Sequence, residues 1–358
     1  APQDGRINLQ VGGRSIDYRF STTPTIYGEK VVLRLLGHLK EEAIPEISSL
    51  LFTKQNYSTL LRLLKRPNGI FFVTGPTGSG KSMTLYSCLR HLNAPETNIM
   101  TIEDPVEYRL AGVNQIQVNH DIGFDFSKAL RSFLRQDPDI ILVGEIRDLE
   151  TAKIACEAAL TGHLVLATLH TNTAIQAFVR LIDMGVEPYM AAPTVIGAIG
   201  QRLVRRICDK CKTTRVLRRD ELEERFLFEG NPEVAVAVGA GCPDCRGTGF
   251  RGRIAIQEIV EVNDEMRTLV GRAAPIMELS RVVEAAGTHS MYYDGLKKVL
   301  RGLTTFEEID KAAESLRALI MPTKKIVILE DKGPEPRQDE LPVVERMADL
   351  KQQAGQAV

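Results

Sequence analysis

The chain has 358 residues, of which 44% are hydrophobic, and its formal net charge is −1 at pH 7. This length is enough for roughly two or three domains with cores of their own. A charge so close to zero argues against a general nucleic-acid binder or a membrane-surface protein. The apolar runs have strand length, no basic-then-apolar leader opens the chain, and six cysteines lack a secretory context, so we expect a reducing cytoplasm. The first residue is Ala rather than Met, so we also expect a fragment of a longer protein.

Strand-like runs open the chain over residues 6–36, and a helix with a leucine-rich face is predicted over residues 47–66. From residue 70 to about residue 200, apolar strand-like runs such as IFFVTG and DIILVGE alternate with helical patterns. Alternation of this kind is typical of a parallel sheet covered by helices, so the sequence predicts an α/β fold.

The second half of the chain is more polar. Residues 202–252 are charged and glycine-rich and contain four cysteines, and residues 261–318 are predicted to be helical. The segment KKIVILED is predicted to be a strand, and VVERMADLKQQAG a short amphipathic helix after a polar linker.

The stretch GPTGSGKS follows an apolar strand and precedes a helix, and it fits the pattern G-x-x-x-x-G-K-[ST]. Its glycines allow the backbone to turn N–H groups toward an anion, and Lys81 can reach the terminal phosphates of a nucleotide. The Ser82 hydroxyl can bind Mg²⁺. A plain glycine-rich turn is the alternative interpretation. The predicted phosphate-binding residues are Gly75, Pro76, Thr77, Gly78, Ser79, Gly80, Lys81 and Ser82.

Three other strand-like runs end in residues that suit phosphate chemistry. TIEDPVE supplies Glu103, IILVGEIRD supplies Glu145 and HLVLATLHTN supplies His170. Ligands bind open parallel sheets at the carboxyl ends of the strands, so we expect these side chains beside the phosphate loop. Each could instead be a solvated strand end, but three such ends beside one phosphate loop favour a nucleoside triphosphatase site.

These segments together resemble the secretion ATPase superfamily, the motors of type II secretion and type IV pilus assembly. TIEDPVE resembles the family's Asp box, IILVGEIRD its Walker B segment and GH…TLHTN its His box, over residues 2–318. The resemblance implies a RecA-like P-loop fold that binds ATP. It further implies that Glu103 is the general base, that Glu145 holds Mg²⁺ through water, and that His170 positions the γ-phosphate.

Two arginines upstream of the phosphate loop gain a role from the same resemblance. In this family, arginines of the second N-terminal domain fold over the nucleotide, and the matching positions are Arg19 and Arg34. A guanidinium neutralises the charge that develops on a transferred phosphoryl group. The alternative is a pair of arginines on the solvated faces of two strands.

Two CxxC pairs, Cys208 with Cys211 and Cys242 with Cys245, enclose 30 intervening residues. The spacing is typical of a structural Zn²⁺ site with four thiolate ligands and no open coordination position. Disulfides and an iron–sulfur centre are the competing interpretations. The family's extension and secretion motors commonly carry such an insert.

The resemblance predicts a homohexameric ATPase that couples hydrolysis to the assembly of pilin-like subunits. It implies peripheral association with the cytoplasmic face of the inner membrane, against a platform protein, without a direct nucleic-acid partner. A RecA-like nucleic-acid translocase and a catalytically silent nucleotide-binding scaffold are the alternatives. The expected domains are the end of a truncated PAS-like second N-terminal domain (1–40), a linker and helix (41–66), the RecA-like ATPase core (67–205), the tetracysteine insert (206–252), a C-terminal helical part (253–318) and a tail of unknown role (319–358).

Overall fold

The structure is a computed structural model that describes residues 1–11, 14–36, 44–228, 233–314 and 326–328. At its centre is a seven-stranded sheet with the strand order β13-β9-β4-β8-β7-β5-β6. Neighbouring strands are parallel except β13, which runs antiparallel to β9. The predicted α/β fold is therefore confirmed. The strands are β4 (Gly69–Thr74), β5 (Ile99–Glu103), β6 (Asn114–Gln117), β7 (Ile140–Val143), β8 (Leu164–Leu169), β9 (Val195–Ile207) and β13 (Phe250–Glu261).

Helices cover both faces of this sheet, which is why its inner strands are continuous apolar runs. In β4, Ile70 and Phe72 pack into the core cluster that includes α3 to α6, α8 and α9. Phe71 and Val73, which point to the other face, pack against α1 and α2. The helices are α1 (Lys54–Leu64), α2 (Lys81–Leu92), α3 (Phe126–Phe133), α4 (Leu149–Leu160), α5 (Gln176–Asp183), α6 (Pro188–Thr194), α8 (Asp264–Gly271) and α9 (Ile276–Ala285).

The helix expected over residues 47–66 is interrupted, and that prediction was wrong in detail. A short 3-10 helix, η2 (Ile47–Leu50), ends where Leu51 takes a left-handed conformation with φ 58°. Helix α1 then begins after Thr53, whose side chain accepts a hydrogen bond from the backbone N–H of Asn56. A Thr cap of this kind starts a new helix and is invisible to a count of apolar positions.

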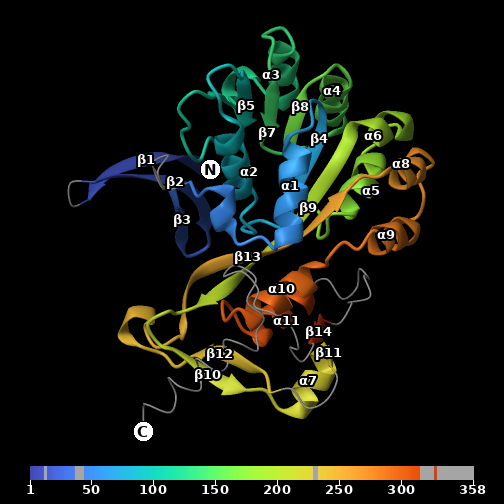
Figure 1. Cartoon of the computed structure of the whole chain (residues 1–358). Helices are drawn as coiled ribbons and strands as arrows, with labels where there is room; N and C mark the ends of the chain where they lie inside the picture. Colours follow the sequence, from blue (N-terminus) through green and yellow to red (C-terminus); the bar gives the residue numbers. More distant parts are fainter. Residues whose placement is uncertain (12–13, 37–43, 229–232, 315–325, 329–358) are drawn as a thin grey trace.

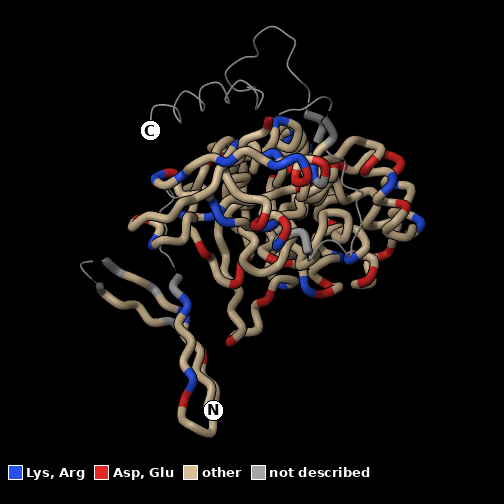
Figure 2. The backbone as a smooth tube through the Cα atoms, turned by 90° about the horizontal axis from the view of Figure 1, so that it is seen from below, with Lys and Arg blue, Asp and Glu red and all other residues tan. Residues whose placement is uncertain are grey.

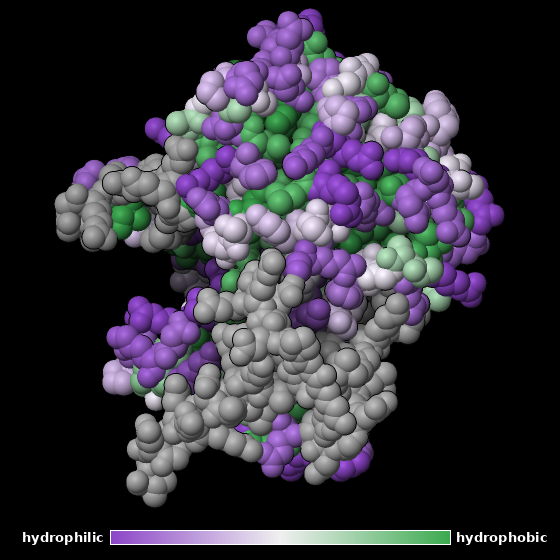
Figure 3. Space-filling model, viewed as in Figure 1, coloured by the Kyte–Doolittle hydropathy of each residue, from purple (hydrophilic) through white to green (hydrophobic). Residues whose placement is uncertain are grey.

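The first residues form an antiparallel sheet of β1 (Gln3–Val11), β2 (Arg14–Thr25) and β3 (Gly28–Leu36), as the strand-like runs predicted. This N-terminal sheet projects from the rest of the molecule in two perpendicular views (Figures 1 and 2). In the space-filling view, hydrophilic side chains surround a smaller hydrophobic region at the centre of the upper lobe (Figure 3).

Below the central sheet, the cysteine-containing segment packs on the C-terminal helices (Figure 1). One core cluster joins Leu222 and Val236 of that segment to Leu296 and Ile309 of the two last helices. The expected boundary between residues 252 and 253 falls inside β13, so the C-terminal part begins within a strand of the central sheet. The remaining elements are η3 (His120–Ile122), β10 (Lys212–Val216), α7 (Arg219–Arg225), β11 (Phe226–Phe228), β12 (Ala235–Gly239), η4 (Pro243–Cys245), α10 (Met291–Leu300), α11 (Phe306–Glu314) and β14 (Ile326–Ile328).

The tail predicted over residues 319–358 is described only at β14, which pairs in parallel with β11. This short strand lies within the segment for which the sequence predicts a strand. The amphipathic helix predicted over residues 343–355 lies outside the described residues.

Candidate functional site

Strands β4, β8, β7 and β5 lie side by side and parallel, so the segments after them meet at one edge of the sheet. The phosphate loop follows β4, Glu145 follows β7 and His170 follows β8, whereas Glu103 is the last residue of β5. The four separated motifs therefore lie on adjacent strands, as the alternation of strands and helices predicted.

The phosphate loop needs glycine at three of its positions. Gly75, Gly78 and Gly80 have φ angles of 147°, 79° and 87°, which side chains other than glycine rarely adopt. Gly80 is the N-cap of α2, and Lys81 is the first helical residue. The N–H groups of the first turn of α2 and the helix dipole thus lie at the end of the loop, where they favour an anion.

The Lys81 ammonium lies inside the loop and donates hydrogen bonds to the carbonyls of Gly75 (2.8 Å) and Pro76 (3.1 Å). Burial lowers the pKa of Lys81, while the carboxylate of Glu145 acts in the opposite direction. The buried Ser79 hydroxyl has no hydrogen-bond partner among the described residues. An unpaired buried hydroxyl and a half-buried ammonium in one loop fit a loop that binds an anionic ligand.

Glu145 and His170 face each other at the same edge, with 3.4 Å between the His170 Nε2 and a Glu145 carboxylate oxygen. The second oxygen of Glu145 forms an ion pair with Arg147. A hydrogen bond to β8 holds the segment that carries Glu145, because the Thr168 hydroxyl donates to the Gly144 carbonyl at 2.6 Å. The carboxylate is largely buried and the imidazole half-exposed, so both can meet a ligand.

Glu103 is buried and accepts three hydrogen bonds. The donors are the hydroxyls of Tyr86 and Thr101 (2.8 Å) and the side-chain amide of Gln115 (3.3 Å). Burial raises the pKa of the Glu103 carboxyl, and the three hydrogen bonds act in the opposite direction. A carboxylate with a raised pKa is a better general base, but here it must loosen these bonds before it can reach a water molecule. No sequence motif identifies Tyr86, because it contacts Glu103 only through tertiary packing.

Two neighbouring residues of β9 also reach this edge. The Gln201 side chain donates to the Ser79 carbonyl at 2.8 Å. Arg202 is buried, bonds the Asn172 side-chain oxygen at 2.8 Å, and has an Nε without a partner among the described residues. The burial of Arg202 next to the His box makes it a candidate for contact with the nucleotide.

Arg19 and Arg34 belong to the N-terminal sheet. They are directly opposite each other on β2 and β3 of the projecting N-terminal sheet, and both are exposed (Figure 1). Their place relative to a bound nucleotide stays a prediction.

The four cysteines come together below the sheet. All four sulfur atoms lie within 4.8 Å of one another, and the Cys208–Cys242, Cys211–Cys245 and Cys242–Cys245 pairs are 3.9, 3.8 and 3.7 Å apart. Four sulfurs bound to one zinc ion at about 2.3 Å would lie about 3.8 Å apart. Backbone N–H groups of Cys242 and Gly249 donate to the Cys245 sulfur, as expected around a thiolate ligand. No disulfide joins these cysteines, so the geometry fits a metal site.

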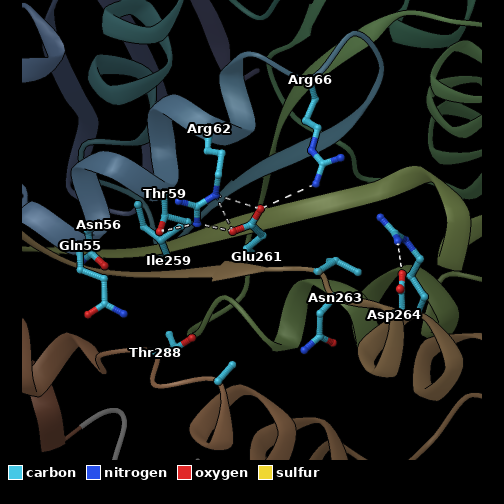
Figure 4. A pocket seen from close by; sticks show the side chains of 13 residues that line it. Gln55, Asn56, Thr59, Arg62, Arg66, Ile259, Glu261, Asn263, Asp264 and Thr288 are labelled. Carbon is cyan, nitrogen blue, oxygen red and sulfur yellow. Dashed lines mark hydrogen bonds and ion pairs between the residues drawn. The ribbon is translucent and has the colours of Figure 1, made fainter.

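A polar pocket of about 530 Å³ lies between α1, the end of β13 and α8, away from the phosphate loop (Figure 4). Its arginines already have carboxylate partners: Arg62 and Arg66 pair with Glu261, and Arg267 pairs with Asp264. We assign it no role in the phosphate site.

A phosphate loop at the carboxyl edge of a helix-covered parallel sheet defines a P-loop nucleoside triphosphatase fold of the RecA-like kind. The family model described as Type II/IV secretion system protein matches residues 1–311, and the chain belongs to this family. Among the described residues, no helix combines the length and apolarity needed to cross a bilayer.

The names of curated relatives refer to type IV pilus assembly and type II secretion, in agreement with the family model. The chain is 50% identical over 309 residues to the type IV pilus assembly ATPase PilB of Thermus thermophilus, covering 86% of this chain and 34% of that protein. It is 49% identical over 312 residues to type II secretion system protein E of Pectobacterium carotovorum, covering 86% of this chain and 61% of that protein. The chain thus spans between a third and about three fifths of the length of these relatives.

Among solved structures, the pilus retraction motor PilT with bound ADP has a TM-score of 0.62 and 30% identity, over 87% of this chain and 77% of that one. The ATPase DotB of Legionella pneumophila has a TM-score of 0.63 at 22% identity, over 88% of this chain and 78% of that one, and supports the fold alone.

Proposed function

We propose that this chain hydrolyses ATP as the motor part of a type II secretion or type IV pilus assembly machine. One observation carries the proposal: Glu145 and His170, which follow β7 and β8, face each other 3.4 Å apart, and β8 pairs with β4, the strand that leads into the phosphate loop with Lys81. The names of the relatives support the choice of ATP and of the two machines.

Each residue has a distinct task in this proposal. The phosphate loop and Lys81 bind the β- and γ-phosphates, which displace the loop carbonyls that the ammonium now contacts. Ser82 and, through water, Glu145 would hold Mg²⁺, which neutralises charge on the phosphates when bound. His170 donates to the γ-phosphate. The Glu103 carboxylate first breaks its hydrogen bond with the Tyr86 hydroxyl. It then accepts a proton from the attacking water.

The tetracysteine cluster is proposed to hold one structural Zn²⁺ through Cys208, Cys211, Cys242 and Cys245. Its four sulfurs have the separations that tetrahedral zinc requires, and no position is open for a substrate. The ion would fix the segment that packs on α10 and α11, where a small apolar core supplies the remaining support.

We further propose that the chain works as a homohexamer against a platform protein on the cytoplasmic face of the inner membrane. Arg19 and Arg34 would complete the site by closing over the nucleotide when the N-terminal sheet changes position. The exposure of both arginines leaves them free for this contact. Acidic and basic residues are interspersed along the chain, a distribution that does not favour a nucleic-acid groove (Figure 2).

Steady-state ATP hydrolysis by the assembled protein tests the proposal. We expect Lys81→Ala to lose binding and turnover, and Glu103→Gln to keep ATP binding but lose at least about 100-fold in turnover. Glu150→Gln is the matched control, because Glu150 is an exposed carboxylate that pairs with Arg131 outside the site. Equal rates in all four proteins would overturn the catalytic assignment, and a salt-dependent affinity for DNA in the range of about 1 μM would favour a translocase.

A further inference from the structure

A line of buried polar side chains connects the phosphate loop to the C-terminal helix α10. Gln201 on β9, Gln257 on β13, and Asp294 and Lys298 on α10 are each at most 1% exposed. Polar groups are removed from water at a cost, so a buried row of them needs a reason beyond packing. Gln201, Gln257 and the Asp294–Lys298 pair are far apart in the sequence, and they meet because β13 lies between β9 and α10.

Every hydrogen bond along this line has the same direction. The Lys298 ammonium donates to the Gln257 side-chain oxygen at 3.4 Å, and the Gln257 amide donates to the Gln201 side-chain oxygen at 3.3 Å. The Gln201 amide then donates to the Ser79 carbonyl at 2.8 Å. An ammonium can only donate and a carbonyl can only accept, so the two ends together fix which way both amides point.

At the Gln201 end of the line, the hydrogen bond to the Ser79 carbonyl orients one peptide group of the phosphate loop. A trans peptide holds its C=O and N–H on opposite sides, so a Ser79 carbonyl fixed toward Gln201 directs the Gly80 N–H away from Gln201. The Gly80 N–H is one of the backbone N–H donors that a phosphate loop directs toward an anion. The contact is close, because a Cβ atom added at Gly80 would lie 3.0 Å from the Gln201 amide nitrogen.

The other end of the line is anchored to α10. Lys298 also donates to Asp294 and to the Ala255 carbonyl, both at 2.6 Å, and Asp294 accepts the backbone N–H of Gln257 at 2.9 Å. A second connection starts at the next residue of β13, Glu258. Its carboxylate accepts the backbone N–H of Met291, the first residue of α10, and that of Ala174, close to the His box.

We propose that Gln201 is a positioning residue for the phosphate loop, and that the Asp294–Lys298 pair of α10 controls it through Gln257, so that the C-terminal helices regulate nucleotide affinity. This inference rests on the proposed nucleotide-binding function. A displacement of α10 would break the line at Gln257 and release the Ser79 carbonyl. The ATP site would then weaken without any change in the residues that touch the nucleotide.

A double-mutant cycle tests the proposal with a fluorescent non-hydrolysable ATP analogue and Mg²⁺. Gln201→Met is expected to weaken binding of the analogue about tenfold, because it removes the hydrogen bond from this side chain to the phosphate loop. Asp294→Asn combined with Lys298→Met removes both charges of the buried pair together and keeps an acceptor for the Gln257 N–H. We expect this pair of changes to weaken binding about threefold to tenfold in the wild type.

In the Gln201→Met background, the same α10 changes should have no further effect on affinity, because the line is already broken. Gln201→Leu serves where Gln201→Met folds poorly, because it too has no group that can donate to the Ser79 carbonyl. Thr304→Val is the matched control, because this fully buried hydroxyl bonds the Arg205 carbonyl away from the line. Its melting temperature should fall while its affinity for the analogue stays unchanged.

Additive losses of affinity in the cycle, or unchanged affinity in the Gln201 variants, would overturn the regulatory line alone. A wild-type protein that fails to bind the analogue would instead overturn the proposed function and this inference together. The two failures are thus distinguishable by the wild-type measurement.

Discussion

Alanine substitution at two glycines of the phosphate loop tests the geometry of the loop in the absence of nucleotide. A Cβ atom at Gly75 would lie 2.5 Å from both the Gln201 carbonyl oxygen and the Ser79 hydroxyl. Ordinary contact begins at 3.4 Å, so 3.4 less 2.5 leaves an overlap of 0.9 Å with a backbone atom of β9. At Gly78 an added Cβ would meet nothing within 4 Å, although the φ of 79° there is also unfavourable for alanine.

The two variants separate backbone strain from overlap. Gly78→Ala should lower the free energy of unfolding by about 1–2 kcal/mol, the cost of a left-handed residue. Gly75→Ala adds overpacking to the backbone cost of a φ of 147° and should lower the free energy of unfolding by about 4 kcal/mol. Because the chain has no tryptophan, urea unfolding is best followed by circular dichroism, with equal m-values as the control for comparable transitions. Equal losses in the two variants would refute the close approach of the loop to Gln201.

Two further predictions concern Glu103 and the cysteines. Burial raises the pKa of Glu103, so its stabilising contribution is complete below the unfolded pKa and is lost as pH rises through the folded pKa. As the pH rises from about 4 to about 8, Glu103→Gln should therefore gain stability relative to the wild type, by about 1.4 kcal/mol for each unit by which the pKa is raised. Thermal melting of both proteins at the two pH values measures this difference. A difference in stability that does not change with pH would contradict the prediction. Cys245→Ser should abolish bound zinc and expose residues 206–252 to hydrogen exchange, whereas unchanged zinc content by elemental analysis would exclude Cys245 as a ligand.

Much of the fold could be predicted because its inner strands are buried on both faces. Runs such as IFFV are apolar at every position, so they are distinct from the amphipathic helices between them. The phosphate loop was predictable because its glycines and lysine are required by local backbone conformation and charge. The proximity of Glu145 to His170 could be predicted from the rule that parallel strands end at one edge of the sheet.

Other features depend on contacts that no local pattern reports. The hydrogen bond of Tyr86 to Glu103 arises where α2 approaches β5, and the amides of Gln201 and Gln257 meet only through the pairing of β9 with β13. Leu51 ends one helix and Thr53 caps the next, although the leucine pattern runs through both. Arg19 and Arg34 were assigned by resemblance alone, and their place beside a nucleotide stays a prediction.

The most direct test of the account is a crystal structure of the assembled protein with Mg²⁺ and a non-hydrolysable ATP analogue. We predict that the Lys81 ammonium exchanges its loop carbonyls for β- and γ-phosphate oxygens, with Glu145 beside the metal and His170 beside the γ-phosphate. An analogue bound elsewhere, or one whose γ-phosphate lies far from Glu145 and His170, would contradict the convergence of these segments on one triphosphate.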